Sequence, residues 1–203
     1  MSDSLKIPDC CIIYDTEFTS WPGAQERDWS GENEHRELVQ IAAIRINANT
    51  LCEIDQPFNM LIAPRLNPIL SDYFIDLTGI TQADLDRYST TFEDAYTAFC
   101  TYCGNSPAYA FGRDDHVINE NITLYALTDH LPAFESHTLV PWFENNIPEI
   151  FNGTGVCSGT LARAVGADLN APAHNALNDV RSIRAALHHL HFTRGYPNAL
   201  YDI

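Results

Sequence analysis

The chain has 203 residues, 45% of them hydrophobic and 19% charged, which suits one folded domain with a substantial core. No apolar run approaches the ~18–20 residues of a membrane span, and residues 1–7 carry no apolar segment of signal-peptide length, so we expect a cytoplasmic protein without a membrane partner. The formal net charge of −16 argues against a broadly basic nucleic-acid binder. A phosphate substrate would have to be drawn by local features such as metal ions, a few arginines or helix N-termini.

The stretch from Cys11 to Thr19 begins as an apolar, β-branched run, which predicts a buried strand, and it places Asp15 and Glu17 near its end. Residues i and i+2 of a strand point to the same side, so both carboxylates leave the sheet together, at the end where open α/β sheets bind ligands. Two like charges this close need a compensating partner, and Mg²⁺ or Mn²⁺ is the usual one. On these two residues alone, a strand end passing into a polar turn is an equally good interpretation.

Residues 20–36 form a long polar stretch beside these acids, and a loop of this length is usually functional or mobile. Trp21, Trp29, Arg27 and Arg36 are of the types that stack on bases and hold phosphates. For any one of these residues we favour the plainer alternative, a solvated excursion anchored by its tryptophan rings.

Four further segments have the composition of strands. Residues 38–46 and 51–63, joined by a turn at 47–49, are expected to form a hairpin beside the first strand. Residues 107–112 predict a short buried strand, and residues 139–142 another. The first three strands would then form a meander, with later strands parallel to the first.

Helix signals lie between these strands. Two threonines are each followed three residues later by an acid, as in a capping box: Thr81 with Asp84, and Thr90 with Glu93. The second pair would open an amphipathic helix to about residue 103, where Gly104 ends it. A short helix is expected at 157–166.

Two adjacent acids, Asp114 and Asp115, follow the strand at 107–112 and lead into a helix that runs to about residue 127. Aspartate is a favoured N-cap, so one of the pair is expected to cap the helix while the other binds metal. The residues alone do not decide which.

The last long helix starts near residues 173–179 and carries an apolar stripe at Ala176, Val180, Ile183, Leu187 and Leu190. Asp179 lies beside this stripe and faces the protein body, where an unpaired acid is costly. His174 lies just before or within the first turn. The helix dipole there favours neutral imidazole, the state that a general base requires. The three later histidines, at 188, 189 and 191, are interpreted as a solvated helix end.

Six cysteines are present, but nothing else indicates secretion, so we expect reduced thiols. Cys100 and Cys103 form a CxxC pair. They continue the helical spacing of Phe92, Tyr96 and Phe99, which favours packing over metal binding or a thiol-based redox site.

Carboxylates from separate elements that converge on one point describe a two-metal site, with Asp15, Glu17, one of the acids at 114–115, and Asp179 as ligands. One ion would generate a hydroxide and the other would stabilise the leaving oxygen. His174 would take the proton from the water. This chemistry is phosphodiester hydrolysis.

With these motifs the sequence resembles the DEDDh 3′–5′ exonucleases, which have the DnaQ-like, ribonuclease H-like fold. The motif Asp-Thr-Glu-Phe-Thr at 15–19 is similar to the corresponding motif of the Eri-type branch, which contains many exoribonucleases. The matching motifs, in chain order over about residues 10–192, are Asp15-x-Glu17, Glu37-Leu38-Val39-Gln40-Ile41, Leu77-Thr78-Gly79-Ile80-Thr81, Gly112-x-x-Asp115 and His174-x₄-Asp179.

The resemblance implies a role for each matched residue. Asp15, Glu17, Asp115 and Asp179 would be ligands of two Mg²⁺ or Mn²⁺ ions, and His174 would be the general base. The family's Gly-x-x-Asp spacing selects Asp115 over Asp114. For the substrate, the backbone near Phe18 and Thr19 would meet the terminal 3′-hydroxyl, and Ile80 would lie under a terminal base.

We therefore expect an α/β fold with a ribonuclease H-like mixed five-stranded sheet flanked by helices, as one domain over 1–203. The expected function is a metal-dependent 3′–5′ exonuclease that acts on single-stranded RNA or DNA 3′ ends, with RNA favoured, and releases nucleoside 5′-monophosphates. A homodimer is left open. The alternative is a non-catalytic module that holds a nucleic-acid end or a protein on the same fold, which the complete acid set argues against.

Overall fold

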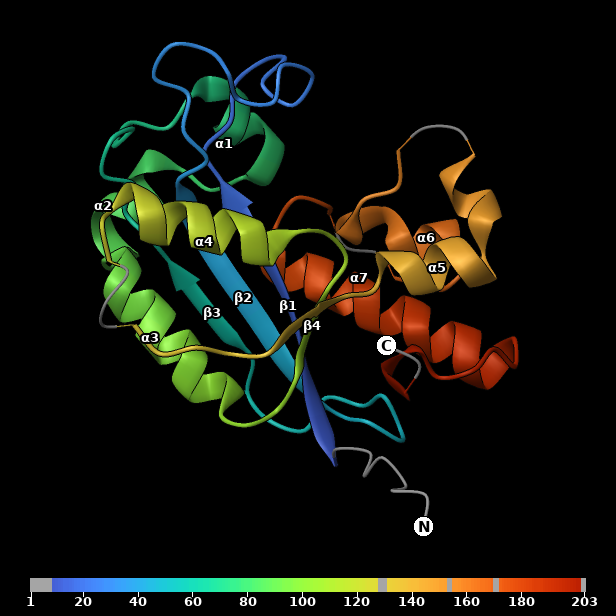
Figure 1. The fold of residues 1–203 in the computed structure, drawn as a ribbon. Helices are drawn as coiled ribbons and strands as arrows, with labels where there is room; N and C mark the ends of the chain where they lie inside the picture. The colour runs from blue at the N-terminus through green and yellow to red at the C-terminus, as the bar shows by residue number, and fades with distance from the viewer. Residues whose placement is uncertain (1–8, 128–130, 153–154, 170–171, 202–203) are drawn as a thin grey trace.

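A mixed five-stranded sheet organises the protein (Figure 1). The structure, a computed structural model, describes residues 9–127, 131–152, 155–169 and 172–201; the segment 1–7, inspected above for a signal peptide, lies outside them. The strand order is β3-β2-β1-β4-β5. The strands are β1 (Cys10–Phe18), β2 (Leu38–Asn47), β3 (Phe58–Leu61), β4 (Ala108–Ala110) and β5 (Ser136–Thr138).

The strand directions place two strand ends at one edge of the sheet. β1 pairs antiparallel with β2 from Cys10–Asn47 to Phe18–Leu38, and β3 pairs antiparallel with β2. β4 runs parallel to β1, and β5 runs parallel to β4. The expected meander and the later parallel strands are confirmed. The carboxyl ends of β1 and β4 therefore face the same side, with their following residues close together.

Helices cover both faces of this sheet (Figure 1). The α-helices are α1 (Asp72–Thr78), α2 (Gln82–Tyr88), α3 (Phe92–Cys103), α4 (Asp114–Leu124), α5 (Val140–Asn146), α6 (Leu161–Ala164) and α7 (Ala176–His188). Short turns of 3₁₀ helix lie at η1 (Pro148–Phe151), η2 (Ser158–Thr160) and η4 (Ala199–Tyr201), and a π-helical turn, η3 (His189–Thr193), continues α7.

Alternate residues of β1 supply two separate cores. Ile13 packs into one with residues of α5, α6 and α7, whereas Ile12 and Tyr14 pack into the other with residues of α3 and α4. This alternation follows from the two-residue period of a strand. Because both faces are covered, β1 reads as the continuous apolar run seen in the sequence.

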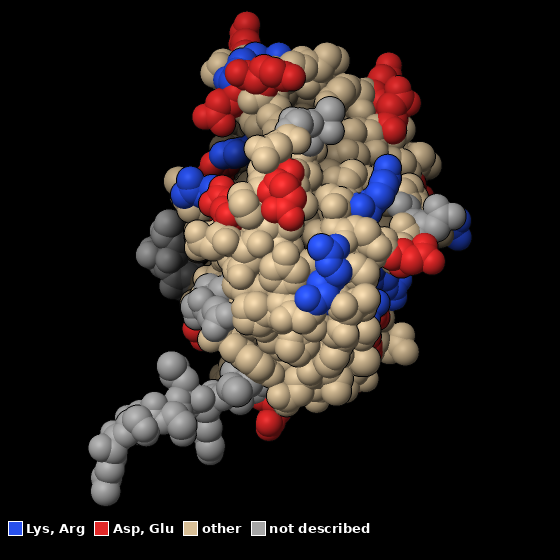
Figure 2. Space-filling view, turned by 90° about the vertical axis from the view of Figure 1, so that its right-hand side faces the viewer, with Lys and Arg blue, Asp and Glu red and all other residues tan. Residues whose placement is uncertain are grey.

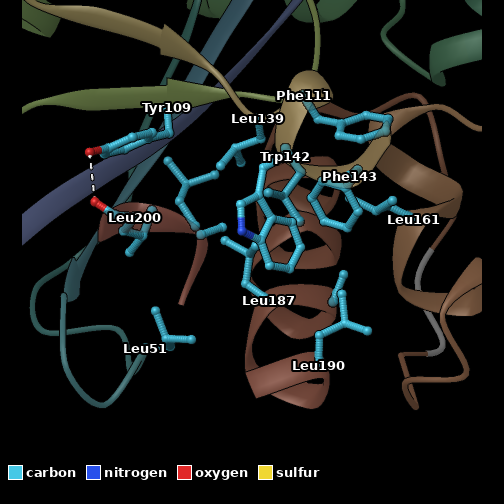
Figure 3. Packing of buried hydrophobic residues seen from close by; sticks show 14 of the residues in the cluster. Leu51, Tyr109, Phe111, Leu139, Trp142, Phe143, Leu161, Leu187, Leu190 and Leu200 are labelled. Atoms are coloured by element: carbon cyan, nitrogen blue, oxygen red, sulfur yellow. Dashed lines mark hydrogen bonds between the residues drawn. The ribbon is translucent and has the colours of Figure 1, made fainter. Parts of the chain in front are cut away.

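The core on the α7 side is built around aromatic rings (Figure 3). Trp142 and Phe143 of α5 contact each other edge to face, with ring centroids 5.1 Å apart. Across the cluster, the Tyr109 hydroxyl donates to the Leu200 carbonyl at 3.3 Å, which ties β4 to the C-terminal η4 turn. This packing fixes α7, the helix that carries Asp179, against the sheet.

Several expected boundaries were wrong. The strand placed at 139–142 lies instead at Ser136–Thr138, and residues 140–146 are helix α5, with Pro141 in its first turn. The strand placed at 51–63 is reduced to Phe58–Leu61, with isolated bridges at Glu53 and Ile62. The helix placed at 157–166 is a 3₁₀ turn followed by the four residues of α6.

Caps and cysteines follow the local sequence closely. The Thr81–Asp84 capping box is confirmed at the start of α2. The cap of α3 is one residue later than expected, at Thr91, whose side chain accepts from the Asp94 amide. All six cysteines are free, and Cys100 and Cys103 are buried in α3, which confirms their packing role.

The surface on the α5–α7 side carries charges of both signs. Figure 2 shows arginines scattered among acids on this face, without a continuous basic track over its described residues. Within the described ranges, the helices are too short or too polar for one of them to cross a membrane.

Candidate active site

Three buried carboxylates meet at the carboxyl end of β1. Asp15 and Glu17 project from β1, and Asp179 projects from the first turn of α7. Their side chains each offer one oxygen, and these oxygens all lie within 4.8 Å of one another. The three residues keep only 5%, 9% and 2% of their surface exposed, so water does little to screen their mutual repulsion. The structure thus brings together the acids that the sequence placed on separate elements.

The fourth carboxylate is Asp114 rather than Asp115. Asp114 is buried at the start of α4, and its Oδ1 accepts from both the amide (3.0 Å) and the hydroxyl (2.7 Å) of Thr16, which lies between the two acids of β1. Asp115 keeps 40% of its side chain exposed, lies 3.8 Å from His116, and lines a neighbouring hollow instead. Neighbouring residues on a helix point about 100° apart, so only one of the pair can face β1.

A turn missed by the sequence analysis completes the acid cluster. The Ser158 hydroxyl donates to Oδ2 of Asp179 at 3.0 Å. The next residue, Gly159, packs so closely that a Cβ there would lie 2.5 Å from Oδ1 of Asp179 and 2.6 Å from Cβ of Ala173. A side chain at position 159 would therefore displace Asp179 or Ala173.

Burial and like charge act together on the titration of this cluster. Burial raises the pKa of Asp15 well above its ordinary value, and the charges of Asp114, Asp179 and Glu17 add to it. Burial likewise raises the pKa of Glu17 and of Asp179. Burial raises the pKa of Asp114 to about 6, although the two hydrogen bonds from Thr16 act to lower it. The cluster therefore holds more carboxylate charge than the protein alone neutralises.

The donor set fits a divalent cation. Carboxylate oxygens are the ligands that hard cations such as Mg²⁺ and Mn²⁺ prefer. Oδ1 of Asp179 is buried and finds no hydrogen-bond partner among the described residues, although Oδ2 is bonded to Ser158. A buried charged oxygen without a partner is costly, and a cation would satisfy it.

His174 lines the same pocket as these acids. It has a left-handed backbone with φ of 62°, just before α7 begins at Ala176. Burial raises the pKa of Asp179, and the Ser158 hydrogen bond and then a charge on His174 act to lower it. The imidazole of His174 is therefore near this carboxylate. The pocket has a volume of about 390 Å³, and its lining includes Phe18, Trp29, Arg36 and Arg113.

The three expected substrate contacts fall in different places. Phe18 lines the pocket. Thr19 is buried, its amide donates to the Glu37 carbonyl and its own carbonyl accepts from Nε1 of Trp29, so its backbone groups are already engaged. Ile80 is buried in a small core with Val39 and does not line the pocket. The roles of all three toward a substrate stay predictions.

Gln40 holds the helix that carries Asp179. It lies on β2 opposite Glu17, and its Oε1 accepts the amide hydrogen of Ala176, the first residue of α7, at 3.0 Å. Its amide nitrogen donates to Asn59 of β3 at 2.8 Å, which fixes the orientation of the group. One buried side chain thus sets α7 relative to β1.

Glu37 anchors the same edge of the sheet. It is fully buried, and its carboxylate accepts the backbone amides of Arg65, Leu66 and Asn67 at 2.5–2.7 Å and the hydroxyl of Tyr125 at 2.6 Å. These four bonds gather the loop after β3 and the end of α4 around the start of β2.

Comparison with known proteins decides the family. A family model described as "Exonuclease" (RNase_T) matches residues 12–187, which is most of the chain. The chain belongs to this exonuclease family. Together with the relatives and the solved structure described next, this match confirms the resemblance to DEDDh 3′–5′ exonucleases of the Eri branch and the ribonuclease H-like fold class.

Two curated human relatives match shorter segments. ERI1 exoribonuclease 2 (Homo sapiens) is 34% identical over 87 residues, which cover 42% of this chain and 11% of that protein. The 3′-5′ exoribonuclease 1 (Homo sapiens) is 41% identical over 54 residues, which cover 27% of this chain and 15% of that protein. The matched segments thus span only a small part of these relatives.

A solved structure matches the whole fold. The nuclease domain of 3′hExo, described as a DEDDh family member bound to rAMP, superposes with a TM-score of 0.73 over 96% of both chains, at 23% sequence identity. At this identity the likeness establishes the fold.

Proposed function

We propose that the protein is a metal-dependent 3′–5′ exonuclease that hydrolyses the terminal phosphodiester bond of single-stranded nucleic acid and releases nucleoside 5′-monophosphates. The observation that carries the proposal is the convergence of four buried carboxylates from β1, α4 and α7, with one oxygen of Asp179 unpartnered among the described residues. Membership of the exonuclease family supports the same reaction.

Asp15, Glu17, Asp114 and Asp179 would hold two Mg²⁺ or Mn²⁺ ions. Bound there, the ions would lower the pKa of a water molecule and would stabilise charge on the attacking and leaving oxygens. The protein's own part is to keep the ligands in place. Thr16 and Ser158 orient Asp114 and Asp179, while the sheet fixes Asp15 and Glu17. Asp114 takes the place that the resemblance gave to Asp115.

His174 is the proposed general base. A water proton would move to an imidazole nitrogen as the water attacks the terminal phosphorus, and the bond from that phosphorus to the 3′-oxygen of the preceding nucleotide would break. The lining of the pocket supports this assignment because it contains His174 beside Asp179. Phe18, which directly follows Glu17 on β1 and lines the pocket, would contact the terminal nucleoside.

We propose RNA as the preferred substrate over DNA, with short single strands favoured over long duplex. The names of the two human relatives, both exoribonucleases, support the first preference. The net charge of −16 and the scattered basic residues of Figure 2 support the second, because a long duplex requires a basic track.

The test is degradation of matched 5′-labelled RNA and DNA oligomers in Mn²⁺, with an Asp15→Asn variant as control. A ladder that shortens from the 3′ end with wild-type protein and is absent with the variant supports the exonuclease. Relative rates on the two strands give the sugar preference. Intact oligomers, bound equally by both proteins, would refute the enzyme and leave the non-catalytic binding module in its place.

A further inference from the structure

A second hollow adjoins the catalytic pocket. It has a volume of about 760 Å³ and lies between the loop 28–36 and one face of α4. Its lining includes Trp29 and Arg36, which also line the catalytic pocket, so the two hollows meet at these residues. The outer part is lined by α4 side chains that the catalytic pocket lacks, among them Asn119 and Leu124. We call this hollow the α4 groove.

Trp29 is fixed at the junction of the two hollows. Its indole Nε1 donates to the Thr19 carbonyl at 3.1 Å, and its ring meets Phe18 edge to face with centroids 5.4 Å apart. The Arg36 guanidinium lies over the indole, 5.2 Å from the ring centroid. An aromatic ring tied directly to the end of the catalytic strand is positioned to stack on a base next to the reacting nucleotide.

The charges of the α4 groove are largely paired within the protein. Arg36 pairs with Glu120 through Nε and Oε2 at 2.8 Å, and Glu34 pairs with Arg27. The groove therefore offers little free positive charge to a phosphate backbone. It offers instead an indole, the Asn119 amide and the Leu124 side chain, which are groups that contact bases.

We propose that the α4 groove binds the unpaired bases of the nucleotides that precede the 3′-terminal one, with their phosphates turned toward solvent. This inference rests on the proposed exonuclease and specifies how its substrate strand leaves the catalytic pocket. It also accounts for strand binding by a chain with a net charge of −16, because stacking on bases needs no basic track.

The experiment measures binding separately from hydrolysis. Fluorescence anisotropy of a labelled single-stranded RNA octamer is recorded with the full chain in Ca²⁺, for wild type and for Asn119→Glu and Asn119→Arg. Asn119 is exposed on α4 and lines the groove but not the catalytic pocket. Thr101→Glu and Thr101→Arg, at an exposed position of α3, control for net charge.

If the RNA strand lies in the α4 groove, a negative and a positive charge at position 119 should have opposite effects on its binding. Asn119→Glu is expected to weaken octamer binding about threefold to tenfold and Asn119→Arg to strengthen it, with both Thr101 variants unchanged. Equal affinity in all five proteins, or no binding by wild type, would overturn the proposal.

The salt dependence of binding tests the orientation of the strand. With phosphates turned outward, the logarithm of affinity is expected to fall with the logarithm of salt concentration at a slope shallower than about −2, since each neutralised phosphate adds about −0.7. A steeper slope would overturn the base-facing arrangement.

Hydrolysis of a dinucleotide separates this inference from the proposed function. A dinucleotide has one nucleotide before the terminal one, which would reach Trp29 at the junction but not the outer part of the groove at Asn119. Both Asn119 variants are therefore expected to cleave it at the wild-type rate. A wild-type protein that binds the octamer through the groove but cleaves neither substrate would refute the exonuclease and leave the groove assignment standing. Cleavage of the octamer that ignores both Asn119 substitutions would refute the groove alone.

Discussion

Replacing Asp15 with Asn should stabilise the metal-free protein while abolishing its activity. Asp15 is buried beside three other acids. Two unit charges at the 4.8 Å limit of the cluster repel by about 3–4 kcal/mol at an effective dielectric constant of 20. Burial raises the pKa values of these carboxyls and so favours protonation, which lessens the repulsion, and the expected gain in unfolding free energy is smaller, about 1–3 kcal/mol. For a chain of this size that gain raises Tm by about 2–12 °C.

The assay is thermal unfolding in EDTA and in Mn²⁺, alongside oligomer hydrolysis. Mn²⁺ should stabilise the wild type more than Asp15→Asn, because the variant has lost a ligand. Activity should fall at least about 100-fold, since several kcal/mol of transition-state stabilisation depend on the bound ions. Asp115→Asn removes the same charge from an exposed carboxylate and should leave Tm within about 1 °C. If Asp15→Asn unfolds at a lower temperature than wild type in EDTA, the repulsion argument is refuted.

Three further predictions follow from the same contacts. Asp114→Asn should lose most activity and Asp115→Asn should retain it; the reverse result in a hydrolysis assay would restore the assignment that the family spacing favours. Glu37→Ala leaves three backbone amides unpaired and should cost about 3–5 kcal/mol in urea unfolding, whereas a loss below ~1 kcal/mol would show that water replaces the carboxylate. Because burial raises the pKa of Asp114 to about 6, above its ordinary 3.8, the folded state binds this proton more tightly than the unfolded state. Metal-free protein should therefore gain stability as pH falls from about 6 toward 4, by less in Asp114→Asn than in wild type, as denaturation at a series of pH values would reveal.

Strand β1 was predictable from sequence because its signals are local. A buried strand requires an apolar run, and the two-residue period alone places Asp15 and Glu17 on one side. Asp179 was predictable for a similar reason, since its position beside the apolar stripe of α7 forces it inward. That acids following β4 would lie near those of β1 needed only the rule that parallel strands end on the same side of a sheet.

The choice between Asp114 and Asp115 depends on tertiary contacts. Both stand in the first turn of α4, and what separates them is the rotation of that helix against β1, fixed by the bonds from Thr16 to Asp114. Ser158 gave even less signal, because a three-residue 3₁₀ turn has no periodicity to detect. Its importance appears only once α7 is packed against it.

The misplaced strand at 139–142 has a different cause. Leu139 and Val140 are apolar residues of the kind found in buried strands. In the structure both pack against the hydrophobic core at the start of α5, and Pro141 suits the first turn of that helix. The true strand, Ser136–Thr138, is polar and half-buried at the edge of the sheet, where apolar patterning is weak.

The central place of β1 has a consequence for how the active site moves. Strands paired on both sides and covered on both faces open only when the whole domain unfolds, so amide hydrogen exchange along β1 should be the slowest in the protein. Residues 172–175, which include His174, form no regular element and should exchange through local opening. Asp15 and Glu17, two of the proposed metal ligands, thus lie on the least deformable part of the chain, whereas the proposed base lies on a segment outside the helices and strands.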